Sequence, residues 1–458
     1  MKLSSTLQIT ALGVALLISP AAYATTLTDA LIQAYQTNPA LRVRQSGLRA
    51  TDETVRQAKG RIQPTVSTSV TTNHANNATA NTQTFTNSAS LTTAIPIYAG
   101  GTGLRRIEQS RYNVLAGRQS LKLSEQEVLL SAVTAYMDVR RDIRNVELAL
   151  NSVKVLTEEV RAASERFEVG EVTRTDVSQA ESRLAASESS LQTSRADLQR
   201  SINSYIAAVG STPKNLRTPP ATPSLPKSGD AAEAIAIAKH PTILQQQFIV
   251  KAAEKDVAIA RGNKSPTASA SVSLSNSSGS ATSTGGSNSS IGLTFGQVIY
   301  QGGQLNSAER QALASLDQAK AELQLAGVQI RQNVQSAYAT WFASKATIQS
   351  RKKQVSAAQI AFEGASEEAK LGARTTLDVL NSEQDLLQAR SNLVAAIRNE
   401  YVNAYTVLST MGLLTVDHLK LGISSYNPDK NYKKVNGAKK FGSKRLKIFD
   451  KIKKKTGN

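Results

Sequence analysis

Apolar and polar residues follow two different periods along this chain. From Ala89 onward, every second residue is apolar or a threonine for about ten residues, and this period of two predicts a β-strand with two unlike faces. The residues predicted to share one face are Ala89, Leu91, Thr93, Ile95 and Ile97. An equivalent set follows later and consists of Ile291, Leu293, Phe295, Gln297 and Ile299. Elsewhere apolar residues recur every seven positions, which predicts coiled-coil helices.

The predicted helices are very long. No proline occurs from Leu104 to Phe167, so this segment can form one helix of about 64 residues and about 100 Å. Its apolar residues at seven-residue spacing are Ile107, Val114, Leu121, Val128 and Ala135. An equivalent set in the second half of the chain consists of Leu316, Leu323, Ile330 and Ala337. The columns of the next helices are Val177, Leu184, Leu191, Leu198 and Tyr205, and Val379, Leu386, Leu393 and Val407. The many Ala, Ser and Gln residues between them favour a tube of paired helices over one globular core.

The chain contains a tandem duplication. The stretch "FEVGEVTRTDVSQAESRLAASESSL", which begins at Phe167, aligns with "AKLGARTTLDVLNSEQDLLQARSNL", which begins at Ala369 (369 − 167 = 202). The same offset of 202 brings "IYAGG" at Ile97 onto "IYQGG" at Ile299. Each copy therefore contains a helix, two strands, a very long helix, a glycine turn and a second long helix.

The duplication divides the chain into five parts. Residues 1–24 read as a signal peptide, 25–212 as the first repeat, and 213–229 as a proline-rich extended linker. Residues 230–412 form the second repeat, and 413–458 form a C-terminal segment with a basic tail that we expect to be disordered. The first helix of each repeat is expected to bend, at Pro39 and at Pro241.

The strands raise a question of closure. The stretches "HANNATANTQTF" and "SSGSATSTGGSNSS" are predicted to be polar loops between paired strands. Two hairpins give four strands, whereas bacterial membrane barrels need about eight or more and cannot leave an open edge in lipid. If the strands cross a membrane, several chains must therefore close one barrel, and the pattern permits two, three or more. Ordinary soluble hairpins are the alternative, although strands this polar would bury little.

The N-terminus predicts export. Lys2 precedes the apolar run Leu7–Ile18, and Ala22-Tyr23-Ala24 fits a cleavage site, so the mature chain is expected to begin at Thr25. The apolar run is too short for a spanning helix, which needs about twenty residues. The chain has no cysteine and only three scattered histidines, so we expect no metal and no cofactor. Paired acids such as Glu158 and Glu159 have no convergent partners, and we expect no enzyme activity.

Positive charge is concentrated at the C-terminus. Of the formal net charge of +19, residues 430–458 contribute +11, from twelve Lys or Arg and one acid (12 − 1). Because the chain is exported, we expect no nucleic-acid partner. Anionic lipid headgroups or the acidic cell envelope are the expected partners of this tail, and a disordered tail without a partner is the alternative.

The export signal, the duplication and the motif "LGARTTLDVLNSEQDLLQARSNL" together resemble the TolC family of outer-membrane efflux proteins, from Thr25 to Leu421. The resemblance implies an α+β membrane protein that assembles as a homotrimer. Its coiled-coil helices would form a periplasmic α-barrel, and four strands from each chain would close a twelve-stranded β-barrel in outer-membrane lipid. It also implies a location in the outer membrane that extends into the periplasm after signal-peptide cleavage.

The same resemblance implies a function. The protein would be the passive exit duct of a tripartite efflux or type I secretion system, gated at its periplasmic helix tips. Its partners would be a periplasmic adaptor (membrane fusion) protein and an inner-membrane transporter of the RND or ABC type. A secreted coiled-coil structural or adhesive envelope protein, without a membrane pore, is the alternative.

The turns between the long helices are the first candidate site. Gly170 and Gly372 are predicted to end one helix, and a threonine three residues further on is predicted to begin the next. In "TRTD" and "TTLD" the threonine and the aspartate have capping-box spacing. Asp176 can therefore act only as a cap, or it can also belong to a gate.

The resemblance assigns roles to several residues at these turns. Asp378 matches the aspartate of the periplasmic aperture ring, while Asn381 stands where a second aspartate is common, which predicts a weaker cation preference. Thr175, Asp176 and Arg374 match the links that keep the tips closed. A solvated helix-end charge is the alternative for Arg374.

The last candidates lie where strand gives way to helix. Glycines are expected to permit the backbone turn there, and the tyrosines are expected to lie near the lipid–water boundary. These residues are Tyr98, Gly100, Gly101, Tyr300, Gly302 and Gly303. Ordinary packing is the alternative role of the two tyrosines.

Overall fold

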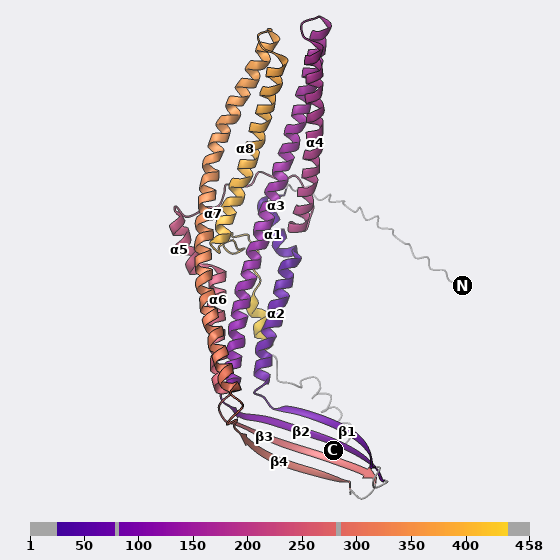
Figure 1. The fold of residues 1–458 in the computed structure, drawn as a ribbon, viewed down its shortest axis with the longest axis vertical. Helices are drawn as coiled ribbons and strands as arrows, with labels where there is room; N and C mark the ends of the chain where they lie inside the picture. Colours follow the sequence, from indigo (N-terminus) through magenta and orange to yellow (C-terminus); the bar gives the residue numbers. More distant parts are fainter. Residues whose placement is uncertain (1–24, 78–81, 281–284, 438–458) are drawn as a thin grey trace, which may run out of the picture.

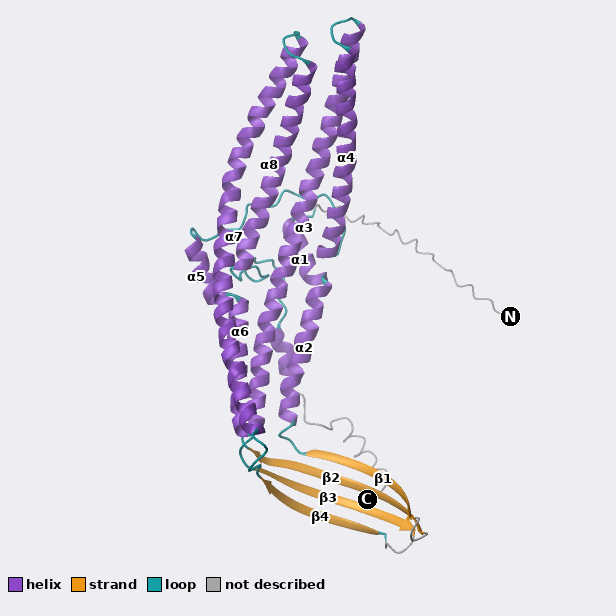
Figure 2. Cartoon of the chain, viewed as in Figure 1, coloured by secondary structure: helices purple, strands orange, loops and turns teal. Residues whose placement is uncertain are grey.

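The computed structural model describes residues 25–77, 82–280 and 285–437, which form a long rod of helices with a four-stranded sheet at one end (Figures 1 and 2). The first repeat contains α1 (Leu27–Thr37), α2 (Pro39–Gly60), β1 (Thr65–Asn77), β2 (Thr82–Ala99), α3 (Thr102–Glu168) and α4 (Arg174–Val209). The second contains α5 (Gly229–Lys239), α6 (Pro241–Gly262), β3 (Thr267–Ser280), β4 (Gly286–Gly296), α7 (Gln304–Lys370) and α8 (Thr376–Thr410). A final helix, α9 (Pro428–Gly437), follows. The order of elements is the same in both repeats, as the sequence predicted.

The predicted bends in the first helix of each repeat are complete breaks. Asn38 and His240 have extended backbones, with ψ of 123° and 127°, and each is followed by a proline at the first position of the next helix. A residue before proline avoids the helical conformation, which ends the preceding helix. The Asn38 side chain then accepts a hydrogen bond from the Ala40 backbone N–H at 2.9 Å and caps α2.

The long helices confirm the heptad prediction. α3 and α7 each contain 67 residues, and the predicted column of α3 from Ile107 to Ala135 is buried at every seventh position. α3 packs against α4, and α7 against α8, so that the chain forms two helical hairpins whose turns lie at the end of the rod opposite the sheet (Figure 1). In the described part of the chain, none of the helices carries an apolar stretch long enough to span a bilayer.

The four strands form one antiparallel sheet in the order β1-β2-β3-β4, and its two faces differ. The register places Val66, Leu91, Leu274 and Val272 on one face together with three residues of β4, which are Ile291, Leu293 and Phe295. The opposite face consists largely of hydroxyl residues, including the row Ser67, Thr92, Ser273 and Ser290. The predicted period of two is therefore confirmed, and the faces of all four strands coincide.

The predicted polar loops are wrong over much of their length. β1 continues through His74 to Asn77, β2 begins at Thr82, and β3 continues to Ser280. Strand pairing joins backbone N–H and C=O groups, so polar side chains do not by themselves end a ladder. Residues 78–81 and 281–284 lie outside the described residues.

The strands also end earlier at the helical side than the pattern predicted. β4 stops at Gly296, so Gln297 and Ile299 do not belong to the strand. Gly296 is opposite Thr267, and the residue before Thr267 is Pro266, which has no backbone N–H to continue the ladder. In β2 the register shifts between Pro96 and Tyr98, which removes Ile97 from the regular alternation.

The linker lies along the middle of the rod, where three tyrosines hold its carbonyl groups. The Tyr136 hydroxyl lies 2.7 Å from the Arg217 carbonyl oxygen, and Tyr401 donates to the Pro220 carbonyl oxygen at 2.9 Å. Tyr338 donates to the carbonyl oxygen of Pro226 at 3.1 Å. Tyr136 is fully buried in the main hydrophobic core, which joins α1, α3 and the C-terminal ends of α4 and α8.

The beginning of the basic tail is ordered, contrary to the expectation of disorder. α9 packs against α2, where Asn431 donates to the buried Asp52 carboxylate at 2.7 Å. Arg118 of α3 forms an ion pair with Asp429 at 2.7 Å. The remainder of the tail, residues 438–458, and the predicted signal peptide, residues 1–24, lie outside the described residues.

Candidate functional site

The two turns between the long helices are built in the same way. Gly170 and Gly372 have φ of 79° and 74°, in the left-handed region that glycine adopts without a steric penalty. The Gly170 backbone N–H donates to the Phe167 carbonyl oxygen at 3.0 Å, and that of Gly372 donates to the Ala369 carbonyl oxygen at 3.1 Å. Both glycines therefore end a helix, as predicted.

Each following helix begins with a complete capping box. The Thr173 backbone N–H donates to Asp176 Oδ2 at 2.9 Å, and the Asp176 backbone N–H donates to Thr173 Oγ1 at 3.3 Å. Thr375 and Asp378 repeat these contacts at 3.1 and 3.2 Å. Hydrogen bonds from the capping threonine lower the pKa of both aspartates, and Arg374 lowers that of Asp378 further. Both carboxylates are therefore ionised at neutral pH.

Arg374 forms its contact within its own hairpin. Its Nε lies 2.8 Å from Glu368 Oε2, and this hydrogen bond raises the pKa of Arg374. Arg374 and Asp176 line the same hollow of about 660 Å³ between the two turns. Among the described residues of one chain, Arg374 contacts neither Thr175 nor Asp176. The link between them stays a prediction.

Asn381 lies one helical turn after Asp378 on α8, and it contacts the other hairpin. Arg183 of α4 donates to Asn381 Oδ1 at 3.1 Å and to Gln384 Oε1 at 3.4 Å. Neither Arg183 nor Glu368 was selected from the sequence. The one signal in the sequence is that the two copies differ in charge at this position, because Arg183 aligns with Asp385 (183 + 202 = 385).

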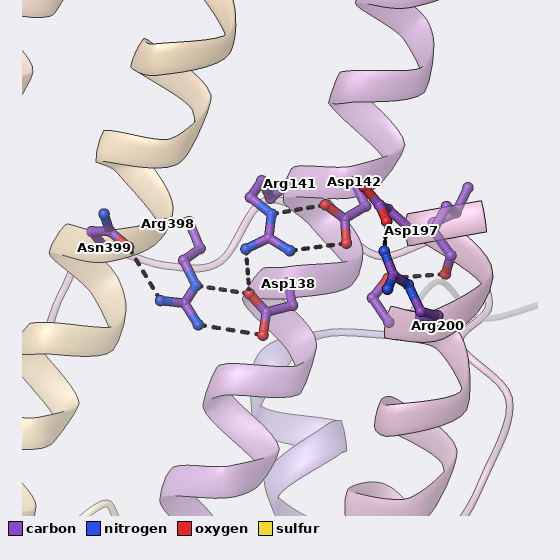
Figure 3. A network of polar contacts seen from close by, with 9 residues as sticks. Asp138, Arg141, Asp142, Asp197, Arg200, Arg398 and Asn399 are labelled. Atoms are coloured by element: carbon purple, nitrogen blue, oxygen red, sulfur yellow. Dashed lines mark hydrogen bonds and ion pairs between the residues drawn. The ribbon is translucent and has the colours of Figure 1, made fainter. Parts of the chain in front are cut away.

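A second set of contacts joins the hairpins halfway along the rod (Figure 3). Arg398 of α8 donates from Nε and Nη2 to the two carboxylate oxygens of Asp138 on α3, at 2.8 and 3.3 Å. Arg141 lies 2.9 Å from the same Asp138 and also pairs with Asp142. A bidentate arginine–carboxylate pair fixes geometry as well as charge. The hairpins are thus held together firmly at mid-length, while at the tips the contacts from Arg183 are exposed.

The junctions between sheet and helices contain the predicted glycines. Gly101 and Gly303 are the residues before α3 and α7, with φ of 70° and 78°. Gly100 and Gly302 also have positive φ, but only Gly100 is tightly packed, because an added Cβ would lie 2.1 Å from the Gly262 carbonyl oxygen.

The tyrosines at the same junctions are exposed. Tyr98 has 52% and Tyr300 has 84% of its surface accessible. A role as anchors at a lipid boundary stays a prediction for both.

Comparisons with known proteins agree with this geometry. The chain matches the family described as "Outer membrane efflux protein" over residues 30–211 and 234–412. It is 34% identical to the outer membrane efflux protein BepC of Brucella suis over 421 residues, which cover 92% of each chain. It is 24% identical to the outer membrane protein TolC of Escherichia coli over 64% of this chain and 63% of that protein. The crystal structure of the CmeC outer membrane channel of Campylobacter jejuni has the same fold, with a TM-score of 0.76 and 15% identity over 89% of each chain.

Proposed function

The chain belongs to the outer membrane efflux protein family, and we propose that three copies of it form one passive exit duct that is gated at the helical tips. It is an outer membrane channel for efflux or secretion. In the proposal, each copy contributes four strands to a closed twelve-stranded barrel, and the helical hairpins form a tunnel in the periplasm. The alternative of a secreted coiled-coil protein without a pore is not supported by the family match.

The observation that carries this proposal is the incomplete sheet. β1 and β4 are edge strands, and residues on the apolar face near these edges are open to solvent in a single chain. Val70 is 78% exposed, Ile291 is 85% exposed and Phe295 is 73% exposed. Open edges and apolar faces of this kind suit lipid only when other strands complete a barrel. Further copies of the same chain supply such strands.

The energy for transport comes, in this proposal, from an inner-membrane transporter of the RND or ABC type that acts with a periplasmic adaptor. These partners would contact the helical tips, which lie farthest from the sheet (Figure 1). In the closed state Arg374, Thr175 and Asp176 would link neighbouring hairpins, and Asp378 would line the narrowest point. A ring of ionised carboxylates at that point favours cations.

Single-channel conductance in planar bilayers tests the gate. Arg374→Ala and Asp176→Ala should each raise the conductance several-fold, because each would remove a charge that links neighbouring hairpins in the proposed gate. Arg144→Ala is the matched control: like Arg374 it is a largely exposed arginine paired with one glutamate, but it lies far from the tips. Unchanged conductance in both tip variants would contradict the gating roles.

Asp176 also caps α4, so its variant needs a second measurement. Losing the cap costs about 1 kcal/mol of local helix stability, which would show as faster hydrogen exchange in the first turn of α4. Thr173→Ala breaks the same cap and keeps the carboxylate. If Thr173→Ala speeds exchange but leaves conductance unchanged, the effect of Asp176→Ala belongs to the gate.

A further inference from the structure

The two repeats carry opposite charges at equivalent positions of the helices near the sheet. We propose that this charge reversal selects how copies of the chain dock: α7 of one copy packs against α2 of the next, and Arg310 forms an ion pair with Glu53 of that neighbouring copy. The inference rests on the proposed assembly of several copies. It deepens that proposal by naming the contacting helix faces, their register and the charges that distinguish a correct neighbour from an incorrect one.

Within one chain, α3 and α6 form the contact between the two repeats near the sheet. The helices run in opposite directions, and Lys255 of α6 lies 2.8 Å from Glu108 of α3. Nearer the sheet, Gly100 and Gly262 are so close that a Cβ atom on either one would collide with the carbonyl oxygen of the other. This contact therefore contains one ion pair and one glycine pair in a fixed register.

The ion pair of this contact is reversed at the equivalent positions. Lys255 of α6 aligns with Glu53 of α2 (53 + 202 = 255), and Glu108 of α3 aligns with Arg310 of α7 (108 + 202 = 310). Both signs change together, so α2 and α7 would attract one another in the register of α6 and α3. Glu53 and Arg310 are exposed, and neither forms an ion pair within the part of the chain that the structure describes.

The glycine pair is present in both repeats. Gly262 aligns with Gly60, and Gly100 aligns with Gly302. In one chain, a Cβ atom added to Gly60 or Gly302 would meet nothing within 4 Å. Gly302 has a φ of 54°, which by itself favours glycine, but Gly60 is a helical residue at the end of α2. Nothing within one chain requires glycine at position 60, whereas close approach of a neighbouring copy would.

The face of α2 that carries Glu53 is open. α6 packs against both α3 and α7, whereas α2 packs against α3 and α9. Ala252 and Ile259 of α6 are buried, but the aligned residues Ala50 and Gln57 of α2 are exposed. Glu53 lies three positions after Ala50 and four before Gln57, so these residues share one side of the helix. α9 binds α2 through other residues and leaves this side free.

The topology brings the two open faces together. α3 and α6 lie between α7 on one side and α2 on the other (Figure 1). α2 leads into β1, and α7 follows β4, which are the two edge strands of the sheet. A neighbour that places its β1 beside β4 therefore also places its α2 beside α7. The sheet and the helices would be completed by the same neighbouring copy.

The charge reversal also disfavours incorrect neighbours. If α3 packed against α2 of another copy, Glu108 would meet Glu53. If α7 packed against α6 of another copy, Arg310 would meet Lys255. Like charges across an interface are unfavourable, so each repeat is complementary to the other repeat and not to itself. First and second repeats should therefore alternate around the assembly.

Charge reversal in the full mature protein, purified in detergent, tests the inference. Glu53→Lys and Arg310→Glu each bring two like charges together, so each should raise the protein concentration at which half of the chains are assembled by about tenfold. The combined variant restores an opposite-charge pair and should return this concentration to within about threefold of the native value. Light scattering over a dilution series measures the assembled fraction.

Two further variants separate the pair from general effects of charge and folding. Lys352→Glu makes the same charge change on α7, but Lys352 aligns with Leu150, which stays 36% exposed within α3. It should leave assembly unchanged. Gly60→Ala keeps all charges and suits a helix, so the single chain should fold as before, while the added Cβ should weaken assembly.

Three results would overturn the inference while the native chain still assembles. The first is native assembly in both single variants. The second is weakened assembly in the single variants without recovery in the combined variant, which would show that Glu53 and Arg310 do not face one another. The third is unchanged assembly in Gly60→Ala. A native chain that stays single at every concentration would instead overturn the proposed assembly itself, so the two failures are distinguishable.

Discussion

Arg183 is the residue that connects the two hairpins nearest to the predicted aperture. It donates to Asn381, which stands where the family resemblance would place a second aspartate of the aperture ring. Asn381 is therefore more than a neutral replacement for that aspartate, because it has a hydrogen-bond partner of its own. A neutral acceptor there satisfies an arginine of the neighbouring hairpin, and the pair adds no net negative charge to the opening.

Replacing Asn381 with aspartate tests this relation. In Asn381→Asp the new carboxylate would form an ion pair with Arg183, and an exposed pair of this kind is worth about 0.2–1 kcal/mol. Cation preference should therefore change less than about twofold in the single variant, but by up to about fivefold when Arg183→Gln is added. The reversal potential across a bilayer in a salt gradient measures both. Equal selectivity in the single and double variants, with Arg183→Gln alone as control, would contradict the pairing.

Residue contacts within one turn could be predicted from the sequence, and contacts between hairpins could not. The capping boxes follow from the T-x-x-D spacing alone, because all partners lie within four residues. The pair Glu368–Arg374 spans a left-handed glycine, and its equivalents in the first copy are Arg166 and Val172. Duplication therefore preserves the backbone of the turn but not its charges, so one copy does not predict the contacts of the other.

Among the helices, α8 carries a buried acid that affects how the hairpins pack. Glu383 is only 8% exposed. It lies in a seam with α3 and α4 whose other residues include Ala149, Ser152, Leu156, Arg183 and Ser187. Burial raises the pKa of Glu383, and Ser152, Arg390 and Arg183 oppose part of that rise. The folded pKa is higher than the unfolded one, so this residue stabilises the packing at low pH, and the contribution is lost as the pH rises through the folded pKa.

Glu383→Gln should therefore protect the seam at neutral pH. Hydrogen exchange of residues 149–156 and 380–387 should be slower in the variant than in the native chain at about pH 7.5. The difference should shrink as the pH approaches about 4.5, where the unfolded glutamate also binds a proton. Glu181→Gln is the control, because Glu181 occupies the equivalent position of the first copy and is exposed. A pH-independent difference, or the same effect in Glu181→Gln, would refute the burial account.

The helices were easier to predict than the strands. The absence of proline and the heptad columns determined α3 to within two residues at each end, because helix contacts along a column are local. Strand ends depend on the partner strand: Pro266, the residue before β3, has no backbone N–H to continue the ladder where β4 stops, and the bulge in β2 removes Ile97 from the regular alternation. α9 was missed because its stability comes from distant residues such as Asp52 and Arg118, and its own composition is polar.

At the level of the whole molecule, a single chain leaves both its sheet and its layer of helices open at the sides. The sheet has two free edges, and α7, at the side of the helical layer, exposes large apolar residues that include Val328, Phe342 and Ile360. Each is more than 60% exposed. In the proposed trimer, β1 of one copy would pair with β4 of the next, which is a head-to-tail interface. Such an interface closes into a ring only if the rotation from one copy to the next equals 360° divided by the number of copies.

The absence of cysteine allows this closure to be tested by oxidation. Ser67 and Ser290 lie in one row of the hydroxyl face, on opposite edges, and Ser69 and Asn288 lie in the next row. Pairs of cysteines introduced at one β1 position and one β4 position should form disulfides between copies when their Cα atoms are about 4.4–6.8 Å apart. All four combinations are tested, so that different staggers between the neighbouring strands are covered. At least one should give covalent dimers and trimers on denaturing gels without reducing agent.

The pattern of products identifies the symmetry. In a head-to-tail ring each introduced residue faces a different residue of the next copy, so Ser67→Cys alone or Ser290→Cys alone should give no product. A two-fold symmetric dimer would instead crosslink through a single cysteine near its axis. The double variants should give bands that stop at three copies, because the third disulfide closes the ring. Bands that continue beyond three would show an open or larger assembly, and four strands per copy would then no longer give a barrel of twelve.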